Sequence, residues 1–335
     1  MRVGYNPNKD QKLEETSWTH QVIVPVFIPS MTGYFRDSLE ILKLCLESLR
    51  RTTHDLTFLT VVDNGSCKEV RDFLHTLHHK EEIHELITTT NIGKINAALK
   101  GALGHNMPLV TITDADVLFK TDWQNETVRI FNGIPKTGVV GLIPQFLSYQ
   151  YNSENLLFNN FFSNKVKFKA VKDPEAMAAF YDSIGWDRTY PKERLKKILC
   201  YDDSAVVACV GAGHVVATYR REILDAVKFK SNYKMGGDSE ASLDQLPSHL
   251  GYYSYTTYRN YACHMGNVLE DWMNKTVFPI NKMSENLNIS SPPTKPSSFI
   301  LRVKKKFISF IFKNYKLRMI FLKHKELPED IRPFF

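Results

Sequence analysis

Residues 108–120, PLVTITDADVLFK, are an apolar run that two aspartates interrupt and that then resumes. Leu109 and Ile112 predict a buried strand, because a short continuous apolar run is typical of a strand covered on both faces. Asp114 and Asp116 stand one residue apart where this strand leaves the core. Two close carboxylates repel each other and lose solvation unless a positive group lies between them. The pair therefore points to a neighbouring cation, and a metal ion is one candidate.

Apolar strands and amphipathic helices alternate in front of this segment. Strands are predicted within residues 20–29, 56–66 and 83–90, and helices within 38–53, 67–80 and 91–104. This alternation indicates right-handed βαβ units and a parallel sheet with helices on both faces. Ligands of such sheets bind at the carboxyl ends of the strands. The loop after Pro25, Asp63, residues 91–94 and the two aspartates all fall at those ends, so we expect them at one edge.

The second half of the chain is less regular. Residues 205–224 predict a strand, a Gly-Ala-Gly turn, a second strand and a helix, with His214 as a loop residue. Residues 233–267 predict a glycine loop, a short helix and a final strand that reaches His264. Residues 276–297 are rich in Asn, Ser and Pro, which is the composition of a linker.

The positive charge of the chain is concentrated at its end. The 335 residues carry a net charge of +7, and from residue 297 onward ten Lys and Arg face three Asp and Glu, which also gives +7. The remainder is neutral, which argues against a nucleic-acid-binding domain. The start has no signal-peptide pattern, no run reaches the apolar length of a membrane span, and the five cysteines lack CxxC spacing. We expect a cytoplasmic, reduced protein without a thiolate metal site.

Six motifs in order make residues 20–268 resemble the inverting GT-A glycosyltransferases of family 2. The motifs are VIVPVFIP at 22–29, VVDNGS at 61–66, NIGKINAALKG at 91–101, DAD at 114–116, GGDSEASL at 236–243 and a late His264. The chain departs from the family pattern at Ala98, Leu99 and Gly237. The resemblance implies an α/β GT-A (Rossmann-like) fold with a mostly parallel sheet, helices on both faces and a C-terminal basic amphipathic helical tail.

The resemblance also implies a reaction and a set of site residues. The reaction is metal-dependent inverting transfer of a sugar from a nucleotide-sugar, UDP-linked by family habit, to a hydroxyl of a glycan or lipid-linked acceptor in cell-surface polysaccharide synthesis. The nucleotide-binding residues are Pro25, Val26, Asp63, Asn91, Gly93, Lys94 and Asp114. The metal ligands for Mn²⁺ or Mg²⁺ are Asp116, Asp114 and His264, because hard divalent ions neutralise a leaving diphosphate. The base that deprotonates the acceptor is Asp238, with Glu240 as the alternative.

We expect four segments along the chain. They are an N-terminal extension at 1–18, a catalytic domain at 19–275 with a nucleotide half (19–120) and an acceptor half (121–275), a linker at 276–297 and a basic segment at 298–335. On a helical wheel, residues 300–323 separate a basic arc from an apolar side, with Lys304 and Arg318 among the exceptions. This pattern predicts that 298–325 binds an anionic membrane, at the inner face of the plasma membrane. The alternative is packing against the catalytic domain or a sister subunit, and an oligomer is compatible with the sequence.

Two other functions fit parts of the pattern. A sugar nucleotidyltransferase also uses a parallel sheet and paired carboxylates, but residues 24–35, VPVFIPSMTGYF, lack the glycine-rich basic loop expected for a triphosphate. A catalytically silent membrane-associated partner could keep the same fold. Retention of Asp63, Lys94, Asp114, Asp116 and Asp238 argues against the silent partner, since an idle site has no use for repelling carboxylates.

Overall fold

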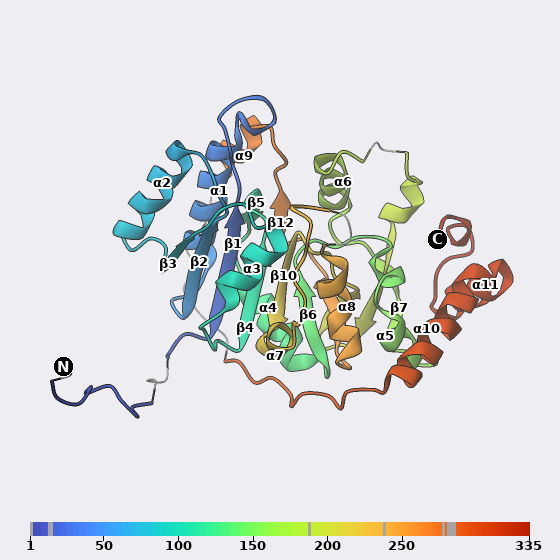
Figure 1. Ribbon diagram of the computed structural model, residues 1–335. Helices are drawn as coiled ribbons and strands as arrows, with labels where there is room; N and C mark the ends of the chain where they lie inside the picture. Colours follow the sequence, from blue (N-terminus) through green and yellow to red (C-terminus); the bar gives the residue numbers. More distant parts are fainter. Residues whose placement is uncertain (1–2, 13–15, 187–188, 237–238, 277–278, 280–285) are drawn as a thin grey trace.

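The structure, a computed structural model, describes residues 3–12, 16–186, 189–236, 239–276, 279 and 286–335. Most strands belong to one large sheet (Figure 1). The strands are β1 (His20–Val26), β2 (Thr57–Asp63), β3 (Glu85–Thr88), β4 (Leu109–Thr113), β5 (Val117–Phe119), β6 (Thr137–Gly141), β7 (Val166–Ala170), β8 (Lys197–Asp202), β9 (Val207–Val210), β10 (Val216–Arg220), β11 (Tyr253–Thr257) and β12 (Ala262–His264). The helices are α1 (Ser38–Thr52), α2 (Lys68–His79), α3 (Lys94–Ala102), α4 (Trp123–Gly133), α5 (Glu154–Asn159), α6 (Pro174–Ser183), α7 (Arg221–Asp225), α8 (Ala241–His249), α9 (Asp271–Lys275), α10 (Ser298–Lys313) and α11 (Tyr315–His324).

The large sheet has ten strands in the order β3-β2-β1-β4-β10-β6-β11-β9-β8-β7. The first four are parallel, as the alternating pattern of the sequence predicted. Strand β10 is antiparallel to both of its neighbours, and β9 and β7 also oppose the strands beside them. Seven of the ten strands therefore run in one direction, which confirms a mostly parallel α/β sheet. The antiparallel strands of the acceptor half are the part that the sequence did not specify.

Successive side chains of the central strands pack against different helical layers. Val22 and Val24 of β1 join the cluster that contains the buried faces of α1 and α2. Ile23, between them, joins the cluster formed with α3 on the other side. Because neighbouring side chains of a strand point to opposite faces, a run in which every residue is apolar must be covered on both. The prediction of helices on both faces of the sheet is confirmed (Figure 1).

The opening segment does not stay in one sheet. Strand β4 ends at Thr113, and after the aspartates the chain enters β5, which pairs antiparallel with β12 in a separate two-stranded sheet. The final strand expected at the end of the second half is likewise two strands, β11 in the large sheet and β12 in the small one. The two aspartates therefore lie where the chain passes between sheets. Both aspartates belong to the connection between two strands and to neither strand itself.

The loop between β9 and β10 crosses the end of the sheet. Both strands were predicted with a Gly-Ala-Gly turn between them, but they are not neighbours, because β6 and β11 separate them. The loop, residues 211–215, is tied to β11 by a hydrogen bond of 2.7 Å from Thr256 Oγ1 to the Gly211 carbonyl. At its far end the Asp114 amide donates to the Val215 carbonyl at 2.9 Å. The loop thus connects the acceptor half to the aspartate pair.

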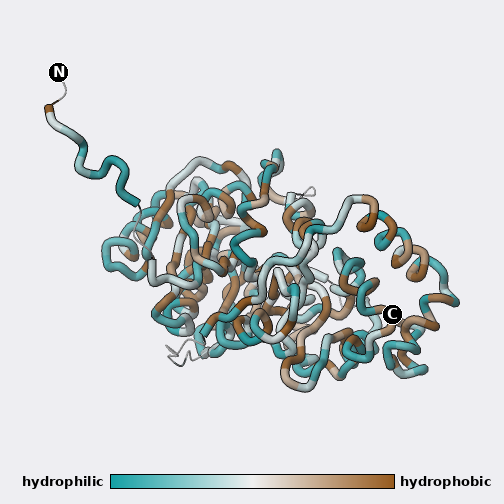
Figure 2. The backbone as a smooth tube through the Cα atoms, turned by 90° about the horizontal axis from the view of Figure 1, so that it is seen from below, coloured by the Kyte–Doolittle hydropathy of each residue, from teal (hydrophilic) through white to brown (hydrophobic). Residues whose placement is uncertain are grey.

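The basic segment forms two helices, not the single continuous helix that the wheel assumed. Asn314 ends α10 and caps α11, where its side chain accepts from the Leu317 amide. Part of the apolar side is buried against the acceptor half, including Ile308 and Phe321 at 3% and 2% exposure. Brown and teal alternate along the stretch that leads to the C-terminus in Figure 2, as expected for helices with one side packed and one side open. Part of the apolar face is therefore buried within the protein, whereas docking of that whole face on a membrane would require all of it to be exposed.

Candidate active site

A cleft of about 370 Å³ opens at the carboxyl ends of the parallel strands. Of the residues predicted from the sequence, Pro25, Val26, Asn91, Lys94, Asp114 and Asp116 line it. The wall also contains residues that the sequence did not single out: Phe27, Ile28, Tyr34, Phe35, Asn64, Lys234, Met235 and Asn267. Most of these come from the loop after β1 and from the segment before α8. The strand-end argument therefore located the cleft, while its apolar and amide walls depend on how the loops fold over it.

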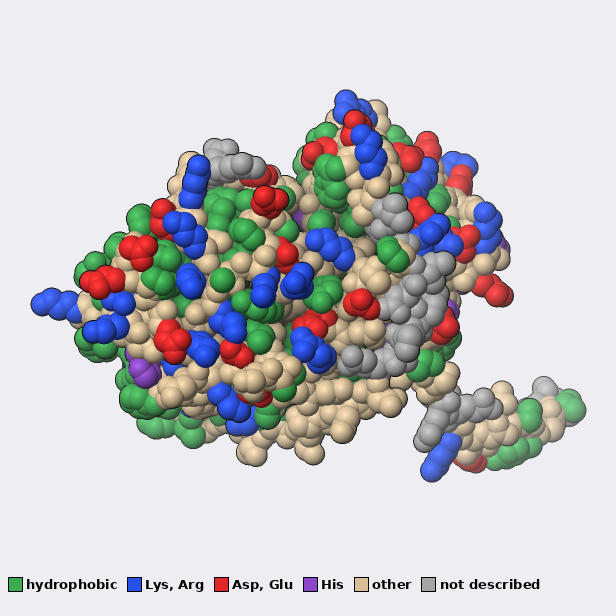
Figure 3. Space-filling model, turned by 180° about the vertical axis from the view of Figure 1, so that it is seen from behind, with side chains coloured by type: hydrophobic (Ala, Val, Ile, Leu, Met, Phe, Trp, Pro, Cys, Tyr) green, Lys and Arg blue, Asp and Glu red, His purple; other side chains and the backbone are tan. Residues whose placement is uncertain are grey.

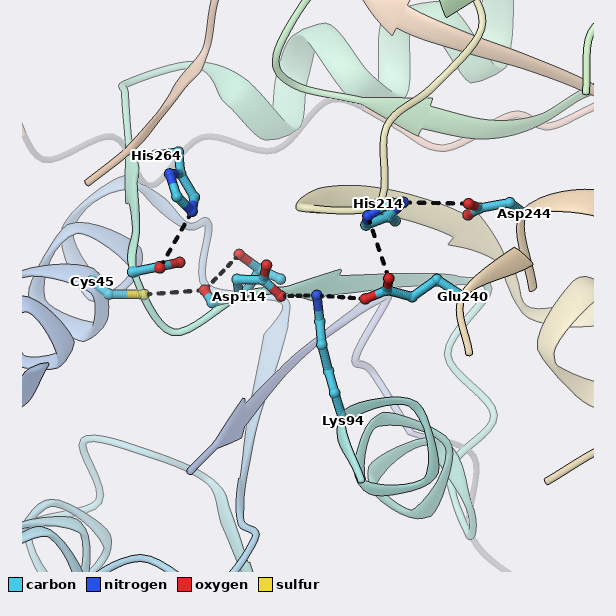
Figure 4. A network of polar contacts seen from close by, with 9 residues as sticks. Cys45, Lys94, Asp114, His214, Glu240, Asp244 and His264 are labelled. Atoms are coloured by element: carbon cyan, nitrogen blue, oxygen red, sulfur yellow. Dashed lines mark hydrogen bonds and ion pairs between the residues drawn. The ribbon is translucent and has the colours of Figure 1, made fainter. Parts of the chain in front are cut away.

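Lys94 supplies the positive group that the aspartates require. Its Nζ lies 2.6 Å from Asp114 Oδ1 and 2.9 Å from Glu240 Oε1, and all three side chains are at most 22% exposed (Figure 4). Burial alone would lower the pKa of Lys94, but the two carboxylates raise it above its ordinary value. Burial raises the pKa of Asp114 despite the neighbouring ammonium, and Asp116 adds to the rise. The lysine thus links the end of β4, through Asp114, to the start of α8, through Glu240.

Asp116 faces the small sheet and the histidine predicted as its companion. His264 Nε2 lies 3.3 Å from Asp116 Oδ2, and His264 Nδ1 shares a hydrogen bond of 2.9 Å with Ser183 Oγ at the end of α6. Burial alone would lower the pKa of His264, but the bond to Asp116 and the charges of both aspartates raise it. Asp116 Oδ1 is buried and has no hydrogen-bond partner among the described residues. The carboxylate therefore keeps one oxygen available for a ligand.

Asp63 and Gly93 have structural roles that the motifs did not specify. Asp63 is 1% exposed, and its Oδ1 accepts from the Ser66 amide at 2.8 Å. Its Oδ2 lacks a partner in the described part of the chain, and Asn64 rather than Asp63 lines the cleft. Gly93 has a φ of +91°, and a Cβ there would lie 2.5 Å from the Tyr233 carbonyl oxygen. The glycine allows the segment before α8 to approach the start of α3.

The structure describes one of the two candidate bases, Glu240. Asp238 lies outside the described residues. Glu240 immediately precedes α8, and besides Lys94 it faces His214, whose Nε2 lies 3.5 Å from Glu240 Oε2. Burial raises the pKa of Glu240, but Lys94 and His214 outweigh this and lower it. A lowered pKa makes Glu240 a weaker proton acceptor.

His214 and Asp244 are the site residues that sequence reasoning missed. The His214 Nδ1 lies 3.3 Å from Asp244 Oδ2 in the first turn of α8 (Figure 4). His214 lies in a loop, as expected, but its position in the sequence gave no sign of the partner on another element. The one available signal was the pair of carboxylates, Glu240 and Asp244, four residues apart on a predicted helix, which calls for a neighbouring cation.

The donor set at this edge fits a hard divalent ion that a diphosphate helps to bind. Carboxylate oxygens are the ligands such ions prefer, and Mg²⁺ is often held by one or two carboxylates together with substrate phosphates. The unpartnered oxygen of Asp116 meets this requirement, and the His264 imidazole stands beside it. Within the residues that the structure describes, no group of three or more His, Cys, Asp and Glu side chains is arranged to hold an ion by itself. The arrangement fits shared coordination better than a closed protein site.

Comparison with known proteins agrees with this architecture. Residues 22–186 match the family model described as glycosyl transferase family 2. This segment, just under half of the chain, is therefore similar in sequence to the family 2 glycosyltransferases. No sequence among curated proteins matches it.

Solved structures to which the chain is similar include a mannosyltransferase and TarS. A mannosyltransferase of Pyrobaculum calidifontis, in complex with GDP-Man and Mn²⁺, is 16% identical, with a TM-score of 0.43 over 71% of this chain and 54% of that one. TarS of S. aureus, residues 1–349, is 12% identical, with a TM-score of 0.41 over 74% of this chain and 60% of that one. TarS has also been solved with UDP-GlcNAc. The match thus spans about half of the mannosyltransferase chain and 60% of the TarS fragment, and only 37% of a longer TarS chain.

Proposed function

We propose that this protein transfers a sugar from a nucleotide-sugar to a hydroxyl of a glycan or lipid-linked acceptor, with inversion at the anomeric carbon. The observation that carries the proposal is the meeting of Asp114, Asp116, Lys94 and His264 at the edge of a cleft that ends the parallel strands. The similarity of residues 22–186 to the family 2 glycosyltransferases supports it. The UDP form of the donor is part of the proposal, as is a role in cell-surface polysaccharide synthesis.

The charge of the leaving diphosphate would be neutralised by a metal ion held at this edge of the cleft. Asp116, with Asp114 and His264 beside it, would hold Mn²⁺ or Mg²⁺, and the bound ion would stabilise the negative charge that develops on the departing diphosphate. Lys94 would add a second positive group at the same edge. Pro25, Val26, Asn91 and the buried Asp63 are proposed to bind the nucleotide, with Gly93 shaping the loop that carries Asn91.

Deprotonation of the acceptor hydroxyl is assigned to Asp238. Glu240 is less suited, because Lys94 and His214 lower its pKa and hold it ionised as an ion-pair partner. A base on the opposite side of the sugar from the diphosphate allows a single in-line displacement, which inverts the anomeric configuration. Proton NMR of the first product formed would report that configuration through its anomeric coupling constant.

The decisive experiment is nucleotide release from a panel of UDP-, GDP- and CMP-sugars with Mn²⁺, Mg²⁺ or EDTA. We expect metal-dependent release from one donor class, and we expect that nucleotide with metal to raise the melting temperature. Pyrophosphate formation from a sugar phosphate and a nucleoside triphosphate would instead indicate a nucleotidyltransferase. Absence of release from every donor, together with no thermal shift, would leave a catalytically silent protein of this fold.

We also propose that α10 and α11 contact an anionic membrane at the inner face of the plasma membrane, with the catalytic domain in the cytoplasm. Residues 298–325 contain no Asp or Glu. The stripe of Arg302, Lys305, Lys306 and Lys313 lines an open surface hollow together with Phe310, which is 61% exposed. Lys304, an exception on the helical wheel, instead turns inward and donates to Asn155 and Asn159 of α5. No helix in the described parts of the chain is long and apolar enough to cross a bilayer.

Charge complementarity favours a lipid surface for this stripe. On the face of the molecule drawn in Figure 3, basic and acidic side chains are intermixed, whereas α10 and α11 carry basic groups alone. Each Lys or Arg near an anionic surface contributes on the order of 1 kcal/mol. The packed apolar residues of both helices make simple truncation a poor test, because it would uncover the acceptor half.

The membrane proposal is tested by flotation of the full chain with vesicles of phosphatidylglycerol or of phosphatidylcholine. We expect flotation with the anionic vesicles only, and its loss when Arg302, Lys305 and Lys306 are changed to Glu. A control variant makes the same change in net charge at exposed lysines outside the tail: Lys100, Lys228 and Lys230. Equal flotation of both variants would refute docking through the stripe.

A further inference from the structure

Two glycines allow the β9–β10 loop to pass close to residues 145–148. Gly211 has a φ of +93°, and a Cβ there would lie 2.5 Å from the Ser148 carbonyl oxygen. A Cβ on Gly213 would lie 2.3 Å from Gln145 Nε2. A larger residue at Gly211 would meet backbone and adopt a strained φ, whereas at Gly213 it would displace the flexible end of the Gln145 side chain. His214, the next residue, lies beside the start of α8.

At that place His214 lies between two carboxylates of one helix. Glu240 immediately precedes α8 and Asp244 lies one turn further on. Residues four positions apart lie on the same face of a helix, so the two carboxylates are neighbours. The imidazole contacts one with each nitrogen, at 3.5 Å and 3.3 Å. Two carboxylates so placed repel each other, and a cation between them removes that repulsion.

The contact extends an alternating series of charges across the site (Figure 4). It runs from Asp114 through Lys94, Glu240 and His214 to Asp244, with contacts of 2.6, 2.9, 3.5 and 3.3 Å. The series connects the end of β4, the start of α3, the start of α8 and the β9–β10 loop. Each cation in it is shared by two carboxylates.

We propose that His214 is a positioning residue, which as an imidazolium anchors the start of α8 and so holds Glu240 against Lys94, beside Asp114, during sugar transfer. This inference rests on the proposed function. His214 itself touches none of the three proposed metal ligands, and it acts through Glu240 and Asp244. Loss of its charge leaves Lys94 as the single neighbouring cation for Glu240 among the described contacts, which weakens the anchor from the acceptor side.

The charges around His214 favour the protonated form. The hydrogen bond to Asp244 raises the pKa of His214, burial opposes the rise, and the charges of Asp244 and Glu240 add to it while Lys94 lowers it. Tyr219 of β10 lies near both carboxylates and stays neutral, because burial raises its pKa far above the ordinary value. A histidine with a raised pKa contributes its stabilisation below its unfolded pKa and loses it as the pH rises through the folded one. The anchor should therefore weaken on the alkaline side of neutrality.

The test compares pH–rate profiles of the full-length protein and three variants: His214→Gln, His214→Lys and His249→Gln. His249 is an exposed histidine in the last turn of the same helix and serves as the matched control. We expect His214→Gln to lower kcat about tenfold or more, the effect of one lost hydrogen bond between charged groups. The donor KM should change less than about twofold, since the contact of Lys94 with Asp114 remains. The alkaline decline of the wild-type profile should be absent from both His214 variants, and His214→Lys should recover part of kcat because it keeps the charge.

A second measurement keeps the inference testable apart from catalysis. The imidazole of His214 is titrated by NMR in the wild type and in Asp244→Asn, where loss of the main partner should lower its pKa. Wild-type-like kcat and profile for His214→Gln, or an unchanged imidazole pKa in Asp244→Asn, would overturn the anchor. An inactive wild-type protein that still shows the NMR shift would refute the proposed function and leave the anchor standing.

Discussion

Replacement of Lys94 by Met removes the cation that two buried carboxylates share, while the aliphatic part of the side chain is kept. Asp114 and Glu240 are 22% and 16% exposed, so water cannot replace the lost partner at little cost. Removing one member of a buried ion pair costs about 3–5 kcal/mol, mainly because a charge is left buried without compensation. With an unfolding entropy of about 2.1 cal/mol/K per residue over the chain, this corresponds to a fall in Tm of about 4–7 °C.

The matched control is Lys68→Met on α2. Lys68 also forms a short ion pair, 2.5 Å from Asp72, but the two side chains are 78% and 60% exposed. An exposed pair contributes little, so its loss should change Tm by less than about 1 °C. The two substitutions are chemically identical and differ mainly in burial.

The pH dependence makes the prediction more specific. Lys94 opposes the rise in the pKa of Asp114 that burial causes, so in Lys94→Met that pKa should rise further. The folded variant then takes up a proton more readily as the pH falls, and proton uptake stabilises it. Differential scanning fluorimetry without metal or nucleotide should show the deficit in Tm narrowing from pH 7 to pH 5. A deficit as small as that of Lys68→Met, or one that does not change with pH, would refute this account of the site.

Three further predictions follow from single residues. Asp116→Asn should abolish the rise in Tm that Mn²⁺ with the active nucleotide gives. Without metal its Tm should be unchanged or slightly higher, because a carboxylate with an unpartnered buried oxygen is removed. A metal-dependent rise in Tm that persists in Asp116→Asn would contradict the role of Asp116 as a metal ligand. In urea unfolding, Gly211→Ala should lower the unfolding free energy by more than the roughly 1–3 kcal/mol of a strained backbone, because its Cβ would also meet the backbone of Ser148. The control is Gly104→Ala, which has a φ of +85° and open space around it and should show the backbone strain alone. Arg221→Met should lower the unfolding free energy by about 2–3 kcal/mol, because the buried guanidinium donates to the Ala102 carbonyl and to the Gln21 amide oxygen. A loss no larger than that of an ordinary surface substitution would contradict this prediction.

The sequence by itself determined the elements of the nucleotide half and the edge at which its polar residues gather. The apolar run at 22–26 has no polar face, so it could be stable only with helices on both sides. Because the strands of this half are parallel, the site residues at their carboxyl ends, from Pro25 to Asp116, lie at the same edge of the sheet. The basic charge of the tail was equally plain, because it depends only on composition.

Tertiary structure alone decided which distant segments meet. Strand β10 enters between β4 and β6, and nothing in its own residues encodes that choice of neighbours. That insertion makes the β9–β10 loop cross the sheet and brings His214 to the carboxylates of α8, a contact between residues 26 and 30 positions apart. Burial likewise settled which side of α10 packs on α5 and which basic side chains stay open. Periodicity specifies local elements and the faces they must cover, whereas the pairing of strands and the passage of loops depend on the free energy of the whole packed chain.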